Sequence, residues 1–254
     1  MATIESQSTK VLVDSSVTGD AEVANMISIP VANMTNRMVI LKARVKATTS
    51  WHQKEIECLP TIAQLGKSGK LIFHYDDIHR EEYYRKPGSV DGLRFGYLFK
   101  GIKFQPTRSA VNRHAIFQLS PAESKNEKAQ LIKFCTWLLT TYTEHWLPSL
   151  SSHLREHDVR SLQDIQRFSR ICKNLSAKHY DDAFQVWGGE RNQLPFFLTT
   201  NRNFVHAIRE DHSLGLFCKP VLPSELLATF DIVPSEPMPY EYGQTYLLNG
   251  RKYN

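Results

Sequence analysis

The spacing of apolar residues changes near residue 120, and this change limits the folds that the chain can adopt. Between residues 37 and 48, apolar residues alternate with cations, which is the period of two that a half-buried strand requires. Beyond residue 120, apolar residues recur every three or four positions, as in a helix: Leu131, Cys135, Leu138, Tyr142 and Trp146. Strands followed by helices predict an α+β fold. A mostly antiparallel β-sheet region then precedes a helical C-terminal half, and both termini are extended.

The same patterns divide the chain into four parts. We expect a flexible N-terminal arm over 1–24, a β-rich region over 25–119, a helical region over 120–233 and a Pro/Tyr-rich tail over 234–254. The arm contains one short predicted strand, at residues 11–13. Further strands are predicted at 71–75, 94–104 and 115–119, and further helices from residue 161 onward and over 179–187, 201–212 and 224–230. Ser120, Pro121 and Glu123 form a capping box that predicts the start of the first helix.

The cysteines and the N-terminus indicate a compartment. The chain has 254 residues and four cysteines, and no two of the cysteines lie close together in the sequence. This spacing predicts buried free thiols in a reducing environment. The first residues do not resemble a signal peptide, and no window of 18 residues is continuously apolar. We therefore expect a cytoplasmic or nuclear protein.

The net charge of +5 is concentrated in the first half of the chain. Residues 23–54 and 92–122 contain no acidic residue, although both segments contain several cations. These cations predict a basic face that binds nucleic acid, RNA first, or an anionic membrane. The candidate binding residues are Arg37, Lys42, Arg44, Lys46, Arg94, Lys100, Lys103, Arg108 and Arg113. The alternative is an ordinary surface on which acidic residues lie nearby in space.

Aromatic residues alternate within the second acid-free segment. Phe95, Tyr97 and Phe99 would project from one side of a strand over 94–104, between Arg94 and Lys100. Aromatic rings beside cations can stack on bases and bind phosphates. Three alternating rings can equally form the core face of a sheet, and the pattern leaves both interpretations open.

Two histidine-bearing segments could carry chemistry. His74, Asp76, Asp77 and His79 offer two imidazoles and two carboxylates that could bind a divalent metal, or they form a polar strand end and a turn. His206 and Glu210 lie four residues apart on a predicted helix, as a ligand pair, as an acid–base pair, or as part of a solvated face with a local ion pair. No complete catalytic motif is present, so we assign no catalytic residue, no metal ligand and no cofactor.

These observations favour a structural or binding protein without enzymatic activity. Its layout is similar to that of viral matrix, capsid or nucleoproteins, an analogy that rests on no shared motif. The helical half could support self-association, and the Pro/Tyr-rich tail could bind a protein partner or pack as an extension that closes the fold. One alternative is a metal-dependent hydrolase or nuclease that uses His74, Asp76, Asp77 and His79. Another is an adaptor that acts through its surface and tail.

Overall fold

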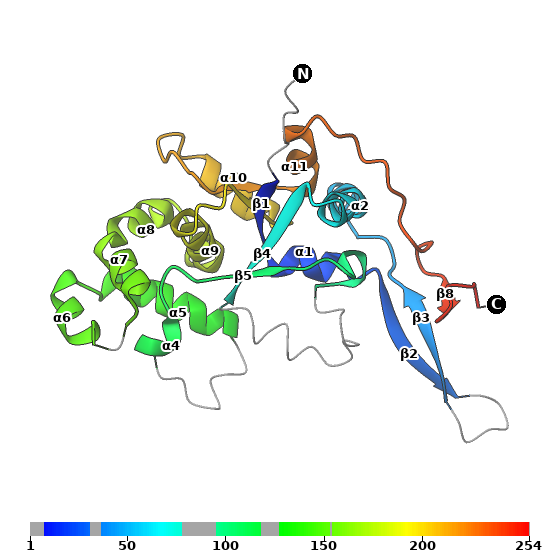
Figure 1. Ribbon diagram of the computed structural model, residues 1–254, viewed down its shortest axis with the longest axis horizontal. Helices are drawn as coiled ribbons and strands as arrows, with labels where there is room; N and C mark the ends of the chain where they lie inside the picture. The colour runs from blue at the N-terminus through cyan, green and yellow to red at the C-terminus, as the bar shows by residue number, and fades with distance from the viewer. Residues whose placement is uncertain (1–7, 31–36, 78–94, 118–126, 153, 254) are drawn as a thin grey trace.

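The centre of the molecule is a five-stranded parallel sheet (Figure 1). The computed structural model describes the whole chain except residues 1–7, 31–36, 78–94, 118–126, 153 and 254. The strands of this sheet are β1 (Thr9–Val13), β4 (Leu71–Asp76), β5 (Gln105–Thr107), β6 (Phe196–Leu198) and β7 (Lys219–Val221). They lie in the order β5-β4-β1-β6-β7, and every neighbouring pair is parallel. All five strands therefore end at the same edge.

Strand β1 lies in the middle of this sheet and is buried on both faces. Its apolar run of Val11, Leu12 and Val13 is typical of a central parallel strand. Val11 and Val13 pack on one side, with α2 (Ser50–Lys67) and α11 (Pro223–Thr229). Leu12 packs on the other side, with α5 (Glu127–Thr140), α8 (Ile165–Cys172) and α9 (Tyr180–Arg191). The short strand predicted at 11–13 is confirmed. However, it is the middle of the main sheet and not part of a flexible arm.

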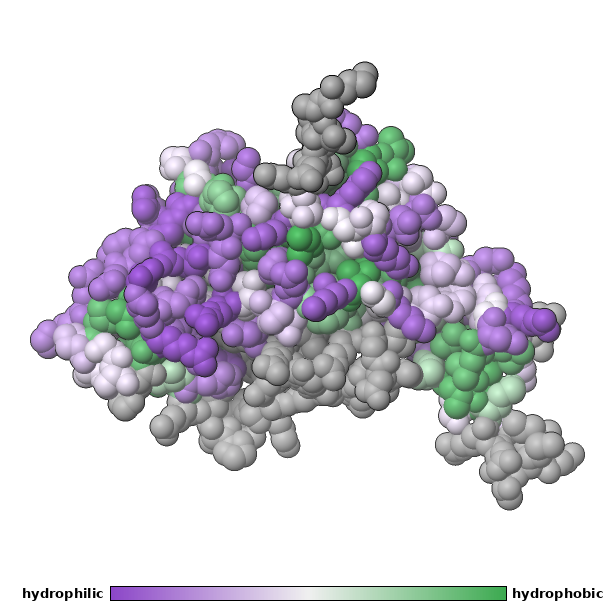
Figure 2. Space-filling model, viewed as in Figure 1, coloured by the Kyte–Doolittle hydropathy of each residue, from purple (hydrophilic) through white to green (hydrophobic). Residues whose placement is uncertain are grey.

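A second, antiparallel sheet lies to one side of the main sheet (Figure 1). It consists of β2 (Ala24–Pro30), β3 (Arg37–Ala43) and β8 (Thr245–Leu247). Figure 2 shows hydrophobic residues gathered on this sheet, where Met26 and Val39 are exposed. Strand β8 comes from the Pro/Tyr-rich tail, in which Tyr240 and Tyr246 are buried. The described part of the tail thus packs as an extension of the fold.

Most of the helices belong to the C-terminal half. The other helices in the described residues are α1 (Ser15–Asp20), α4 (Arg113–Ile116), α6 (Leu147–Leu150), α7 (Glu156–Gln163) and α10 (Arg202–Arg209), with short 3-10 turns η2 (Tyr97–Phe99), η4 (Glu144–Trp146) and η5 (Ala177–His179). Helix α8 buries Ile165, Phe168 and Cys172, as its apolar spacing predicts. Two sheets and a helix-rich C-terminal half confirm the α+β prediction. The capping box at residues 120–123 lies outside the described residues.

All four cysteines are free and buried, as predicted: Cys58, Cys135, Cys172 and Cys218. Burial raises the pKa of the Cys58 thiol to about 11 and holds those of the other three well above the ordinary range. They are therefore protonated and unreactive at neutral pH. Within the described ranges, no helix combines the length and the apolar character that crossing a membrane requires.

The predictions of strands over 94–104 and 115–119 are wrong where the structure describes these residues. Tyr97–Phe99 is a 3-10 turn and Arg113–Ile116 is a helix. The alternation of rings is interrupted by Gly96, whose φ of 91° no strand adopts. The rings themselves belong to the core, where Phe95 stacks on Phe104 with ring centroids 3.9 Å apart and Phe99 meets Phe73 edge to face. Phe99 is buried, and Phe95 and Tyr97 pack partly buried against the core, although the three rings do not form the face of a strand.

The close packing at Gly96 predicts a specific loss of stability. A Cβ atom at residue 96 would lie 2.6 Å from the carbonyl oxygen of Thr18 and 2.8 Å from Ala21. Gly101 has a similar φ of 81° but nothing within 4 Å of a Cβ atom. We expect Gly96→Ala to cost about 1–2 kcal/mol more than Gly101→Ala, because only the first substitution adds a clash to the backbone strain. Urea unfolding of both variants measures the difference, and equal losses would contradict the packing described at Gly96.

Candidate functional site

The carboxyl ends of the parallel strands form one edge of the main sheet. The chain builds β4 and β5 on one side of β1, then returns to build β6 and β7 on the other side. In open parallel sheets, ligands bind at this edge where the strand order reverses. Here the reversal lies between β1 and β6. The first residues beyond these two strands are Asp14 and Thr199.

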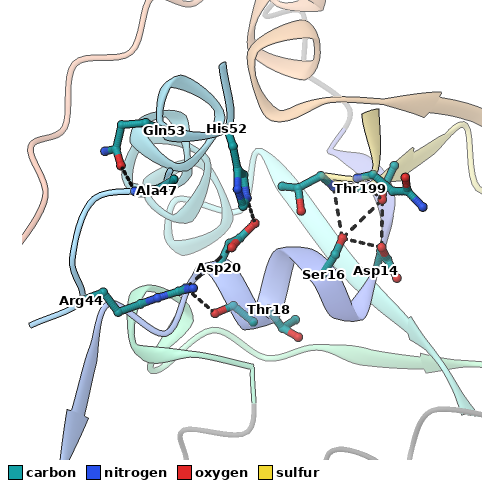
Figure 3. Close-up of polar contacts among 12 residues, drawn as sticks. Asp14, Ser16, Thr18, Asp20, Arg44, Ala47, His52, Gln53 and Thr199 are labelled. Atoms are coloured by element: carbon teal, nitrogen blue, oxygen red, sulfur yellow. Dashed lines mark hydrogen bonds and ion pairs between the residues drawn. The ribbon is translucent and has the colours of Figure 1, made fainter. Parts of the chain in front are cut away.

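Asp14 is buried and accepts hydrogen bonds from two hydroxyl groups (Figure 3). Ser16 Oγ donates to Asp14 Oδ2 at 2.5 Å, and Thr199 Oγ1 donates to the same oxygen at 2.8 Å. The backbone N–H of Asn201 donates in turn to Thr199 Oγ1 at 3.0 Å. These bonds hold the carboxylate of Asp14 against the loop that follows β6.

Two further carboxylates enter from the first turn of α9. Asp181 and Asp182 lie where the partial positive charge of a helix N-terminus stabilises carboxylates. Asn201 Nδ2 donates to Asp182 Oδ2 at 2.9 Å, while Asn201 Oδ1 accepts from the backbone N–H of Phe204 and caps α10. Asn201 therefore joins Asp182 to the loop that also holds Asp14. We refer to Asp14, Asp181 and Asp182 as the carboxylate cluster.

The carboxylate cluster carries more negative charge than the neighbouring cations neutralise. Lys128 Nζ lies 2.7 Å from Asp181 Oδ2, and His179 Nδ1 lies 3.7 Å from Asp182 Oδ2. The other oxygen of Asp181, Oδ1, is buried without a hydrogen-bond partner. Burial raises the pKa of Asp182 to about 6; the contact with His179 opposes this rise, and the charges of Asp14 and Asp181 add to it. Burial lowers the pKa of Lys128, but its bond to Asp181 and the cluster's charge outweigh this effect and raise it.

A groove of about 560 Å³ adjoins the carboxylate cluster. His179, which contacts Asp182, lies in its wall, and so does Arg202, the residue after Asn201. The guanidinium of Arg202 lies 5.5 Å from the ring centroid of Trp51, a cation–π distance. The other charged residues of the wall are Lys178, His206 and Glu210. We call this feature the Trp51 groove.

The His206 and Glu210 pair predicted from the sequence thus lines the Trp51 groove. Arg202 Nε donates to His206 Nε2 at 3.2 Å, so this imidazole already has a cationic neighbour. Among the described contacts, no hydrogen bond joins His206 to Glu210, so the structure does not support an acid–base pair. The pair is better described as part of the groove's mixed-charge wall.

Three of the predicted binding residues, Lys42, Arg44 and Lys46, line another groove of about 540 Å³. Strand β3 ends at Ala43, so the strand predicted to reach residue 48 is too long, and Arg44 and Lys46 lie in the loop beyond it. An acidic residue also lies opposite: Arg44 lies 3.6 Å from Asp20, which is itself 2.7 Å from His52 Nε2 (Figure 3). Although no acidic residue lies near Arg44 in the sequence, Asp20 lies near it in the folded protein.

The other predicted binding residues are dispersed. Lys100 and Lys103 are exposed and line neither groove. Arg108 and Arg113 line a third pocket, with Arg155. Arg94 and the side chain of Arg37 lie outside what the structure describes. The described members of the predicted set therefore do not share one pocket.

The predicted His74–His79 cluster is engaged in hydrogen bonds that organise the strand ends. His74 Nδ1 lies 3.0 Å from Thr107 Oγ1, and burial and the charge of Lys10 lower the pKa of His74. Ser109 Oγ donates to Asp76 Oδ1 at 2.6 Å and to Asp77 Oδ1 at 2.7 Å. His79 lies outside the described residues. Among the residues that the structure does describe, no three His, Cys, Asp or Glu side chains are arranged to hold a metal ion.

The carboxylate cluster was not predicted from the sequence, although each member carries a local signal. Asp14 directly follows the apolar run of β1, as a residue at the carboxyl end of a buried strand does. Asp181 and Asp182 are adjacent acids that begin an otherwise apolar helical segment. Their convergence could not be read from the sequence, because 166 positions separate Asp14 from Asp181.

We compared the chain with known protein families, curated sequences and solved structures. No protein-family model matches the chain, and neither a curated protein sequence nor a solved structure matches it.

Proposed function

We propose that this protein hydrolyses phosphodiester bonds in RNA, using a divalent cation bound by the carboxylate cluster. The observation that carries the proposal is the burial of three carboxylates, Asp14, Asp181 and Asp182, beside the single ammonium group of Lys128. Burying charge without compensation is unfavourable, and such arrangements concentrate at functional sites. A divalent cation would compensate the negative charge of the cluster that Lys128 does not neutralise. Magnesium and manganese prefer oxygen ligands of this kind.

The supports of the three carboxylates indicate what each would do. Asp14 is fixed by Ser16 and Thr199, and Asp182 is fixed by Asn201, so these two form a rigid frame. Asp181 Oδ1 is buried and has no hydrogen-bond partner among the described residues, so it is the oxygen that would accept a new ligand. Among the described residues the three side chains do not surround a common point, so the proposal requires Asp181 to shift toward the fixed carboxylates of Asp14 and Asp182 when a cation binds.

The proposed reaction is the addition of water across a P–O bond. The oxygen of water bonds to phosphorus, the bond from phosphorus to one ester oxygen breaks, and that oxygen leaves with a proton. A divalent cation supplies Lewis-acid stabilisation of the charge that develops on the phosphoryl oxygens. Lys128, whose side chain is 59% exposed, would place a second positive charge beside the same phosphate.

The Trp51 groove supports a nucleic acid as the substrate. Lys178 and Arg202 could bind backbone phosphates beside the carboxylate cluster. The ring of Trp51 contacts Arg202 and His52, so a base would have to displace one of them to stack on it. An acidic centre alone would repel such a polyanion. Cations in the adjoining wall and a net charge of +5 offset that repulsion.

A second candidate function is nucleic-acid binding without catalysis, through the groove that Lys42, Arg44 and Lys46 line. The observation in its favour is the contact of Lys46 Nζ with the ring of Tyr242, 5.7 Å from the centroid, which places a cation and an aromatic ring together. An anionic membrane, self-association and a protein partner for the tail stay predictions from the sequence.

The test of the proposed function is cleavage of end-labelled single-stranded RNA by the full-length protein. We expect cleavage with magnesium or manganese and none with EDTA, because the carboxylates need the cation to accept a phosphate. An Asp14→Asn variant purified in the same way controls for contaminating nucleases. Binding of RNA without cleavage in either cation would refute hydrolysis and favour the second candidate.

A further inference from the structure

The third pocket, which Arg108, Arg113 and Arg155 line, has a volume of about 230 Å³ and lies at the same edge of the main sheet. It lies beyond the ends of β4 and β5, and Arg108 is the first residue after β5. We call it the arginine pocket. Its basic residues are Arg108, Arg113, Arg155, His114 and His157.

The carboxylates of the arginine pocket are used to build its walls. Asp77 Oδ1 accepts hydrogen bonds from Ser109 N at 3.0 Å and from Ser109 Oγ. Asp158 accepts from the backbone N–H of Asn112 at 2.7 Å and of Arg155 at 3.1 Å. Within the described chain, neither of these carboxylates forms an ion pair with the guanidinium of Arg108 or Arg155. Among the described residues, the exposed guanidinium groups of Arg108 and Arg155 therefore have no ion-pair partner in this pocket.

We infer that the arginine pocket binds a phosphate monoester at the end of a nucleic-acid strand, an inference that rests on the proposed function. Guanidinium groups bind phosphate through paired, charge-assisted hydrogen bonds. A terminal monoester carries about −1.5 to −2 charges at neutral pH, more than the single charge of an internal phosphodiester. A small pocket with two exposed guanidinium groups, those of Arg108 and Arg155, favours the more highly charged, terminal group over a continuous backbone.

The position of the arginine pocket relative to the carboxylate cluster supports this role. The pocket lies over β5 and β4, and the cluster lies over β1 and β6, so the two are about 10 Å apart along the sheet edge. Helix α9 begins with the cluster and later crosses the loop that carries Arg108. A Cβ atom at Gly188 would lie 3.3 Å from Ala110 N in that loop, so glycine permits the close crossing. A strand held by its end in the pocket could extend to the cluster.

The test compares the binding of three short RNAs of one sequence: 5′-phosphorylated, 3′-phosphorylated and unphosphorylated. Anisotropy is measured with the full-length protein in EDTA, so the result does not depend on cleavage. We expect one phosphorylated RNA to bind about tenfold more tightly than the unphosphorylated one. The double variant Arg108→Ala/Arg155→Ala should lose this preference, because both side chains are exposed and their removal leaves the fold intact. Arg170→Ala, at another exposed arginine, should keep it.

Competition with inorganic phosphate distinguishes the strand end from free phosphate as the ligand. Under the proposal, free phosphate competes only weakly and the preference for a phosphorylated end persists. Equal binding of all three RNAs would overturn the proposal, as would a preference that survives in the double variant. If binding behaves as expected but no RNA is cleaved, the arginine pocket stands and the proposed hydrolysis fails.

Discussion

Replacing Asp181 by Asn is expected to lower the rate of cation-dependent RNA cleavage by at least about 100-fold, since losing a residue that merely supports a metal ligand costs about 10–100-fold. The substitution keeps the size of the side chain and removes the buried charge whose second oxygen has no hydrogen-bond partner. Initial rates over a range of manganese concentrations measure the effect. A weaker ligand set should also raise the manganese concentration that gives half of the maximal rate.

A matched control for this variant is Asp231→Asn. Asp231 is exposed and has a φ of 55°, a conformation that Asn tolerates well, so its substitution changes charge without disturbing the fold. We expect wild-type cleavage in this control. Full activity in Asp181→Asn, with unchanged manganese dependence, would show that the carboxylate cluster is not the catalytic centre.

The sequence predicted the elements whose patterns are local. The run from Val11 to Val13, the strand over 71–75 and the apolar stripe of α8 each follow from neighbouring residues, because burial of one or both faces imposes the period. Strands β5, β6 and β7 have only three residues each, which is too short for a period to be recognised. Their pairing with the N-terminal strands is therefore visible only in the fold.

The same limit applies to the candidate sites. Lys42, Arg44 and Lys46 were predicted to act together and do line one groove, because three positions so close in sequence remain neighbours. Their charge environment was not predictable, since Asp20 reaches Arg44 from α1. The carboxylate cluster was even harder to predict from the sequence. It depends on a parallel pairing of β1 with β6 that joins residues more than 180 positions apart, as in the contact of Ser16 with Thr199.

Replacing Asp182 by Asn is expected to stabilise the protein at pH 7.5 in EDTA. The pKa of this carboxyl is raised to about 6 in the folded state from an ordinary value of 3.8. A raised carboxyl pKa means that the folded state binds the proton more tightly than the unfolded state does. The contribution of Asp182 to stability is therefore fully present below pH 4, falls as the pH rises toward 6, and stays lost above that pH.

The expected gain in the free energy of unfolding is about 1–3 kcal/mol at pH 7.5, since each pKa unit corresponds to about 1.4 kcal/mol. For a chain of this size the melting temperature should rise by about 2–12 °C, since each kcal/mol corresponds to about 2–4 °C. The gain should vanish near pH 4, where Asp182 of the wild type is already protonated. Manganese should stabilise the wild type at pH 7.5 and stabilise the Asn variant less, because a cation and the substitution relieve the same excess charge.

Asp158→Asn is the matched control, because Asp158 is as deeply buried as Asp182 but its carboxylate accepts two backbone hydrogen bonds. Removing that charge should destabilise the protein at pH 7.5, so the two substitutions are expected to shift the melting temperature in opposite directions. If Asp182→Asn lowered the melting temperature as Asp158→Asn does, the bond from Asn201 would outweigh the repulsion from Asp14 and Asp181. The carboxylate cluster would then carry no excess charge for a cation to relieve, and the argument for a metal-dependent centre would fail with it.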